Sequence, residues 1–138
     1  MKESEKQELG LHVIARAFSK RIEDSNTKFY VSSLRSGQKI EFEGSILVMG
    51  DVNAGAEIVA GEHIIVLGAL RGLAHAGAGG NKKAIITARR IECPQIRIAN
   101  IVKEFEAYDE DEEIDLEPKE YACIENDKIS LKQIKDLT

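Results

Sequence analysis

Apolar residues recur at every sixth position through the centre of the chain. The series comprises Leu34, Ile40, Ile46, Val52, Ile58, Ile64 and Leu70, and Ala76 continues it. A second inward position follows each member by two residues, and a mostly small residue follows it by four. Because alternate side chains of a strand point to the same side, each hexad offers two inward residues and then a small residue at a corner.

This spacing predicts a solenoid of strands. Three hexads make one triangular coil of 18 residues, and stacked coils pair in parallel around a shared aliphatic column. Coils are expected to begin near residues 34, 52 and 70, and a Gly-rich loop at 76–83 interrupts the third. Pairing is expected to resume with Ala84, Ile86 and Ala88, and then with Ile91, Cys93, Ile96 and Ile98. The strands of an antiparallel sandwich show the same alternation of inward and outward residues. A sandwich, however, does not require a six-residue spacing that persists through seven hexads.

The expected fold is therefore all-β, a triangular β-helix of about three to four coils over residues 31–108. Residues 1–30 form a short N-terminal extension or linker, and residues 109–118 form an acidic linker. In residues 119–138 two apolar segments flank the polar sequence Glu-Asn-Asp, which indicates a small C-terminal hairpin that could cover one end of the helix.

One outward face of these coils is predicted to be apolar. Its residues are Leu47, Met49, Ile65, Leu67 and Ile85. Burying five such side chains contributes on the order of 5–10 kcal/mol before the costs of association. An isologous dimer, in which the face meets itself, would bury it, and so would a terminal segment of the same chain.

A second face combines arginines with small residues. Arg35, Asn53 and Arg71 are expected to stack in one column, with Gly37, Gly55 and Leu73 in the column beside it and Asp51 at the corner. Guanidinium groups can fork onto carboxylates, and glycines permit close approach of another backbone. The face is either a protein-docking surface or an ordinary solvated surface with corner glycines.

Composition narrows the function classes. The net charge is −5, which argues against nucleic acid as a partner. Cys93 and Cys123 do not have the spacing of a metal or redox site. No signal peptide or spanning apolar run is visible. The expectation is a cytoplasmic binding protein without catalytic activity, metal, cofactor or direct membrane insertion.

Several motifs resemble the C-terminal domain of the MinC family of bacterial division inhibitors. Leu34-Arg-Ser-Gly-Gln-Lys-Ile40 resembles the Arg-Ser-Gly-Gln signature that opens that domain. The segments 50–60 and 68–78 are also similar to the family, in the same order and at matching separations. The resemblance covers roughly residues 30–102, with a weaker likeness in the terminal hairpin.

The resemblance implies a right-handed β-helix that forms a homodimer and binds the membrane-associated ATPase MinD in its ATP-bound state. By this likeness the MinD site is Arg35, Ser36, Gly37 and Gln38, and the predicted stacking adds Asp51, Asn53 and Arg71. Recruitment of an inhibitor of the FtsZ ring to the inner face of the membrane would block septum formation at wrong sites. The division protein FtsZ is a further partner in the family.

The sequence departs from the family at its start. Members carry an additional N-terminal domain that antagonises FtsZ assembly, and about thirty residues before the signature are too few for it. We expect either an excised C-terminal part or a short relative with weaker action on FtsZ.

Two other functions remain open from the sequence. Hexapeptide-type acyltransferases are also hexad β-helices, with a catalytic histidine, for which His63 and the loop-side His75 are the candidates. A bactofilin-like scaffold would polymerise through the ends of its β-helix, which a terminal hairpin would oppose.

Overall fold

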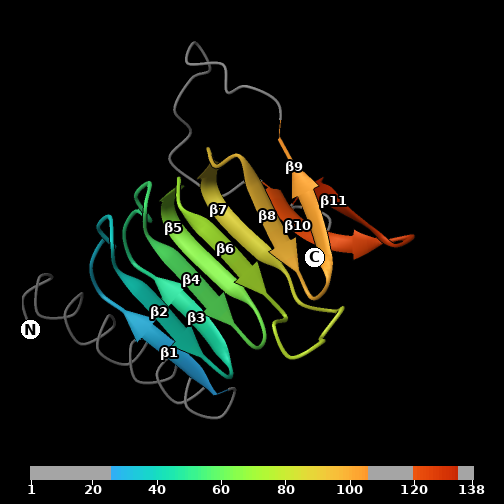
Figure 1. The fold of residues 1–138 in the computed structure, drawn as a ribbon, viewed down its shortest axis with the longest axis horizontal. Helices are drawn as coiled ribbons and strands as arrows, with labels where there is room; N and C mark the ends of the chain where they lie inside the picture. The colour runs from blue at the N-terminus through green and yellow to red at the C-terminus, as the bar shows by residue number, and fades with distance from the viewer. Residues whose placement is uncertain (1–25, 106–119, 134–138) are drawn as a thin grey trace, which may run out of the picture.

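The computed structural model describes residues 26–105 and 120–133, and its regular elements are all β-strands (Figure 1). One sheet, sheet A, contains in spatial order β1 (Thr27–Tyr30), β3 (Ser45–Val48), β5 (Ile64–Leu70), β7 (Ile86–Ile91), β10 (Glu120–Glu125) and β11 (Lys128–Gln133). The other, sheet B, contains β2 (Lys39–Phe42), β4 (Glu57–Ala60), β6 (Leu73–Ala76), β8 (Gln95–Ile98) and β9 (Ile101–Glu104).

The chain alternates between the two sheets, so the strands form coils of a β-helix. β1, β3, β5 and β7 pair in parallel in sheet A, and β2, β4, β6 and β8 pair in parallel in sheet B. Isolated parallel bridges join Leu34 to Val52 and Val52 to Leu70 on a short third side. The predicted all-β, triangular β-helix is confirmed.

The core is the aliphatic column that the hexads predict. Ile46, Val52, Ile58, Ile64 and Leu70 are each 0% exposed. No Trp occurs in the chain, and stacked Ile, Val, Leu and Ala side chains fill the interior. Close packing of this kind stabilises the coils only through their neighbours, since one coil alone cannot bury its inward side chains.

The hexad register changes after Leu70. Val52 stacks on Leu70, but Ile58 stacks on Ala74, because the turn at Arg71-Gly72 is two residues shorter than the corresponding turn in the coil before. Ala76 therefore stacks with Ile98 and, by the same register, with Ala60. The six-residue spacing would have stacked it on Ile58. The Gly-rich loop then lengthens the next coil, so that Ile64 pairs with Ile86.

Antiparallel strands finish the C-terminal end. β9 pairs with β8, β10 pairs with β7, and β11 pairs with β10 across the turn at Asn126-Asp127. The predicted hairpin is thus present, and it extends sheet A at the right of Figure 1. At the other end, β1 begins before residue 31, so the strands start earlier than the hexads indicated. Residues 1–25, 106–119 and 134–138, which include the whole expected acidic linker and most of the expected N-terminal extension, lie outside the described residues.

No helix within residues 26–105 and 120–133 is long and apolar enough to cross a bilayer.

Candidate functional site

Arg35, Ser36, Gly37 and Gln38 form a tight turn between the third side of the β-helix and β2. The Gln38 amide donates to the Arg35 carbonyl at 3.0 Å, and the Arg35 amide donates to the Gln38 side-chain Oε1 at 2.7 Å. Gly37 has a φ of 88°, a conformation that favours glycine. All four residues are exposed, and among the described residues the Arg35 guanidinium makes no ion pair. The signature is therefore a rigid backbone turn that presents an unengaged cation.

The same turn repeats one coil later. The Ala56 amide donates to the Asn53 carbonyl at 3.0 Å, Gly55 has a φ of 89°, and the Gly37 amide donates to the Gly55 carbonyl at 2.9 Å. A Cβ at Gly55 would clash with Ser36 Oγ and lie 3.0 Å from Ser36 Cβ, whereas a Cβ at Gly37 meets nothing within 4 Å. Gly55 therefore packs against the Arg35–Gln38 turn, whereas Gly37 faces open space.

We expect Gly55→Ala to destabilise the fold more than Gly37→Ala. Both variants bear the left-handed backbone strain of about 1–2 kcal/mol, and Gly55→Ala adds an overpacking cost of about 1–3 kcal/mol. Urea unfolding of both proteins measures the difference. Equal midpoints would show that the stacked turns are not in contact.

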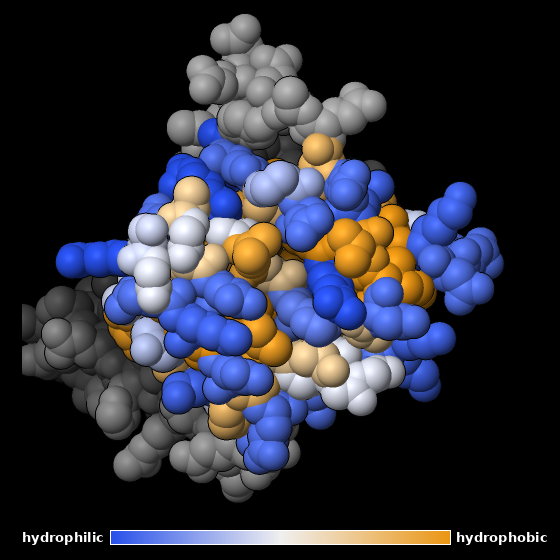
Figure 2. Space-filling model, in the orientation of Figure 1, coloured by the Kyte–Doolittle hydropathy of each residue, from blue (hydrophilic) through white to orange (hydrophobic). Residues whose placement is uncertain are grey.

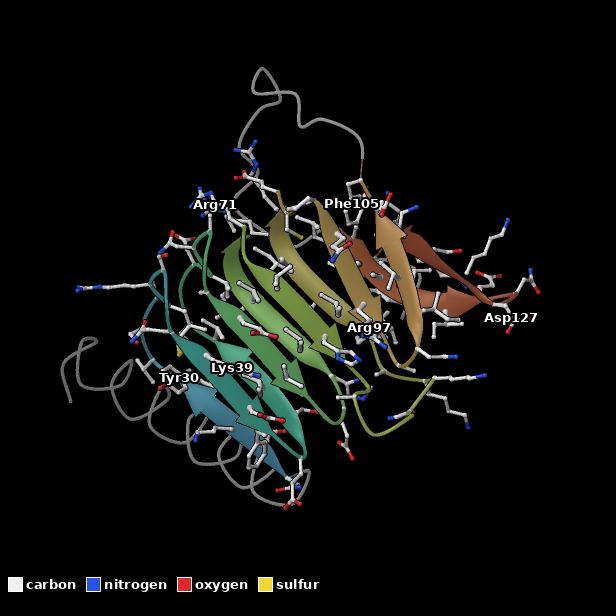
Figure 3. All side chains as sticks on the ribbon, in the orientation of Figure 1. Tyr30, Lys39, Arg71, Arg97, Phe105 and Asp127 are labelled. Atoms are coloured by element: carbon white, nitrogen blue, oxygen red, sulfur yellow. The ribbon has the colours of Figure 1, made fainter. Side chains whose placement is uncertain are left out.

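Asn53 and Arg71 continue the column above Arg35, as predicted. The Asn53 amide donates to the Leu34 carbonyl at 3.0 Å, and its Nδ2 donates to the same oxygen at 2.9 Å. The Arg71 amide donates to the Val52 carbonyl at 2.7 Å, and Arg71 Nη1 lies 3.5 Å from Asn53 Oδ1. Arg71 stands at the edge of the molecule where the chain passes from β5 to β6 (Figure 3).

Glu92 is a member of this column that the sequence analysis missed. Leu70 pairs with Ile91, so Glu92 follows Arg71 in the stack, and its amide donates to the Leu70 carbonyl at 2.8 Å. Its carboxylate lies 2.8 Å from Arg71 Nε and 2.8 Å from Arg90 Nε. The sequence did contain a signal for Glu92, because a polar residue directly follows the inward Ile91, one coil beyond Arg71.

Asp51 makes structural contacts that were not predicted, and Leu73 lies outside its predicted column. The Asp51 Oδ1 accepts a 2.8 Å hydrogen bond from the Ala69 amide, and the Asp51 amide donates to Ser33 Oγ at 2.9 Å. Its carboxylate therefore joins two coils instead of lying free on the surface. Leu73 pairs with Glu57 and not with Gly55, because the short turn before it moves it into sheet B.

The outward face of sheet A carries most of the residues predicted for dimerisation. Met49 is 43% and Leu67 is 42% exposed, and Ile65 is half-buried. The structure adds Phe29, which pairs with Leu47 and is 36% exposed, and Val31, which is 73% exposed. Both residues precede Leu34, where the six-residue spacing begins.

Two residues of that set differ from expectation. Leu47 is only 6% exposed and lies between Phe29 and Ile65 on the adjacent strands. Ile85 does not stack on Ile65, whose partner is Thr87. The coil that contains the Gly-rich loop is four residues longer than 18, so Ile85 lies opposite His63, two positions before Thr87, and its amide donates to His63 Nδ1 at 3.0 Å.

The outward face of sheet B is mixed. Glu57, Leu73, His75, Gln95 and Arg97 line a shallow hollow of about 160 Å³. In Figure 2, hydrophilic side chains interrupt the hydrophobic areas on this side of the molecule, and the widest hydrophobic area lies toward the C-terminal hairpin. His75 Nε2 lies 2.8 Å from the Ala99 carbonyl, so the imidazole binds the backbone.

Cys93 is a buried free cysteine. Burial raises the pKa of the Cys93 thiol to about 11, so the thiol stays protonated at neutral pH. Within the described ranges, no three His, Cys, Asp or Glu side chains gather as metal ligands would.

Comparison with known proteins identifies the family. The chain is 44% identical over 85 residues to the probable septum site-determining protein MinC of Acetivibrio thermocellus, covering 62% of this chain and 37% of that protein. It is 40% identical over 119 residues to that of Persephonella marina, covering 86% of this chain and 58% of that one. The chain thus spans about a third to three fifths of the length of these relatives.

A solved structure has the same fold. A chain of the MinC:MinD cell division protein complex of Aquifex aeolicus superposes with a TM-score of 0.70 at 38% identity, covering 79% of this chain and 87% of that chain. Residues 28–134 match the family described as septum formation inhibitor MinC, C-terminal domain. The chain therefore belongs to the MinC family and carries its C-terminal domain.

Proposed function

We propose that this protein binds the ATPase MinD through the edge formed by Arg35–Gln38, Asn53 and Arg71, and so holds a division inhibitor at the membrane. The observation that carries the proposal is the Arg35–Gln38 turn, which is fixed by two hydrogen bonds yet leaves the Arg35 guanidinium exposed and unpaired among the described residues. The relative of known structure was solved as a MinC:MinD complex. Asp51 supports this edge from within by binding the Ala69 amide.

Sheet A supplies the second half of the proposal, a homodimer. Phe29, Val31, Met49 and Leu67 expose apolar surface on one outward face, around the buried Leu47 and the half-buried Ile65. Apolar patches of this kind mark interfaces, and a two-fold axis lets one patch cover itself. Ile85 lies at the rim of this interface, beside His63.

The dimer would bind a MinD dimer at two sites. The docking edge lies at the turns between sheets A and B, whereas the dimer face lies on the outward side of sheet A, so both surfaces can be used together. The second contact forms within one complex, which raises the avidity for MinD at the membrane. A cytoplasmic protein would thereby be recruited to the inner face of the membrane, where it inhibits the FtsZ ring at wrong division sites.

The two alternative functions fit the geometry less well. Both candidate catalytic histidines contact backbone groups: His75 Nε2 faces the Ala99 carbonyl, and His63 Nδ1 accepts from the Ile85 amide. General acid–base catalysis would have to use the second ring nitrogen of one of these imidazoles beside a bound acyl donor. For a scaffold, the antiparallel β9 and β10 occupy the C-terminal edges on which another parallel coil would stack.

We expect Arg35→Ala to weaken binding of ATP-loaded MinD by about ten- to a hundred-fold, because an interfacial charge pair loses one partner. Gly37→Asp should weaken it similarly, since the new side chain points into open space on the docking edge and adds a negative charge. Titration by biolayer interferometry measures both.

Arg97→Ala is the matched control. It removes the same charge from the exposed face of sheet B and should leave MinD binding unchanged. Sedimentation and urea unfolding verify that all three variants remain dimeric and folded. Unaltered affinity in both Arg35→Ala and Gly37→Asp would refute the assignment of the site.

A further inference from the structure

Glu92 lies between two arginines at the edge of the β-helix. The Glu92 side chain is 10% exposed, and its two carboxylate oxygens each accept one 2.8 Å contact, from Arg71 Nε and from Arg90 Nε. Charge-assisted contacts of this length fix both partners. The Arg71 side chain nonetheless remains 42% exposed, so its guanidinium is held from one side and open to solvent on the other.

A chain of side-chain contacts links this arrangement to the signature turn. Arg71 Nη1 reaches Asn53 Oδ1 at 3.5 Å, and Asn53 Nδ2 donates to the carbonyl of Leu34, the residue before Arg35. Backbone hydrogen bonds join the same positions from coil to coil. Arg35, Asn53, Arg71 and Glu92 thus form one continuous ladder along the edge of four coils.

We propose that Glu92 is a positioning residue that orients Arg71 for binding, extends the docking edge beyond the signature turn, and fits it to carboxylates of the partner. The inference rests on the proposed function and deepens it. Arg35 and Arg71 both expose their side chains on this edge, although the whole chain has a net charge of −5. A guanidinium that is already held in place loses less conformational freedom when it forks onto a carboxylate.

Glu92→Gln tests the proposal through the direction of its effect. If Glu92 acted only through its charge, its removal would strengthen binding to an acidic partner. If it only joined coils, its removal would change stability and leave binding as it was. As a positioning residue, it should weaken binding of ATP-loaded MinD by about three- to tenfold, mainly through faster dissociation.

Two further variants isolate the orientation of Arg71. Arg71→Lys keeps the charge but loses the planar fork, and should weaken binding about as much as Glu92→Gln. In an Arg71→Ala background, Glu92→Gln should have no additional effect, because the side chain that it positions is absent. Glu41→Gln, the same charge change on the exposed face of β2, is the matched control and should bind as wild type.

The outcomes separate this inference from the proposed function. Unchanged or tighter binding by Glu92→Gln, alongside weakened binding by Arg35→Ala, would overturn the role of Glu92 and leave the signature turn as the site. Weakened binding by Glu92→Gln with normal binding by Arg35→Ala would support Glu92 and move the site away from the turn. Additive effects of Arg71→Ala and Glu92→Gln would contradict positioning.

Discussion

Replacing Leu67 by glutamate is expected to convert the proposed dimer into monomers. Leu67 is 42% exposed on the outward face of sheet A, in line with Met49 on the preceding coil. In an isologous interface each substitution enters twice, so two carboxylates would be buried close to one another. The desolvation of unpaired charges costs several kcal/mol, comparable with what the apolar patch contributes.

Leu73→Glu is the matched control for this experiment. Leu73 is 46% exposed, nearly the same as Leu67, but it lies on sheet B. Sedimentation velocity over a range of concentrations should show Leu67→Glu as a monomer and Leu73→Glu as a dimer. A Leu67→Glu protein that still sediments as a dimer would place the interface elsewhere, and dissociation by Leu73→Glu alone would assign it to sheet B.

Ile58→Ala is expected to cost about 2–5 kcal/mol in the free energy of unfolding, enough to unfold a marginal domain. Ile58 is 0% exposed and packs between Ile40 and Ala74 on the neighbouring coils. The small Ala74 above it leaves little to fill the cavity. Stability of a stacked solenoid depends on each coil contact, so one cavity in the column weakens the whole series.

The adjacent Val59 provides the comparison. Val59 points outward from the same strand and is half-buried, so Val59→Ala should cost about 1 kcal/mol or less. Urea unfolding at fixed protein concentration measures both, because the proposed dimerisation would make stability depend on concentration. Similar losses for the two variants would contradict the inward and outward assignment along β4.

The sequence was sufficient to predict the β-helix because its signal is repeated. Val52, Ile58 and Ile64 occupy equivalent positions in successive hexads, and a slip by one residue would expose every one of them. Turn lengths are not repeated in this way. The short turn at Arg71-Gly72 and the longer Gly-rich loop displaced Ala76 and Ile85 from their expected columns.

The candidate site was predictable where stacking alone decides it. Arg35, Asn53 and Arg71 follow inward residues that pair directly, so they share a column. The spacing of residues does not tell which hydrogen-bond donor a polar side chain will bind. Asp51 turns to the Ala69 amide on the next coil, and Glu92 turns between Arg71 on the preceding coil and Arg90 on its own.

Retention of the chain on immobilised MinD, loaded with ATP or with ADP, tests the central claim most directly. The MinD of the Aquifex aeolicus complex is a suitable partner protein for this measurement. We predict that the wild-type chain is retained by the ATP-loaded form and that Arg35→Ala is lost from it. No retention of the wild type on ATP-loaded MinD, or equal retention of Arg35→Ala, would contradict docking through the signature turn.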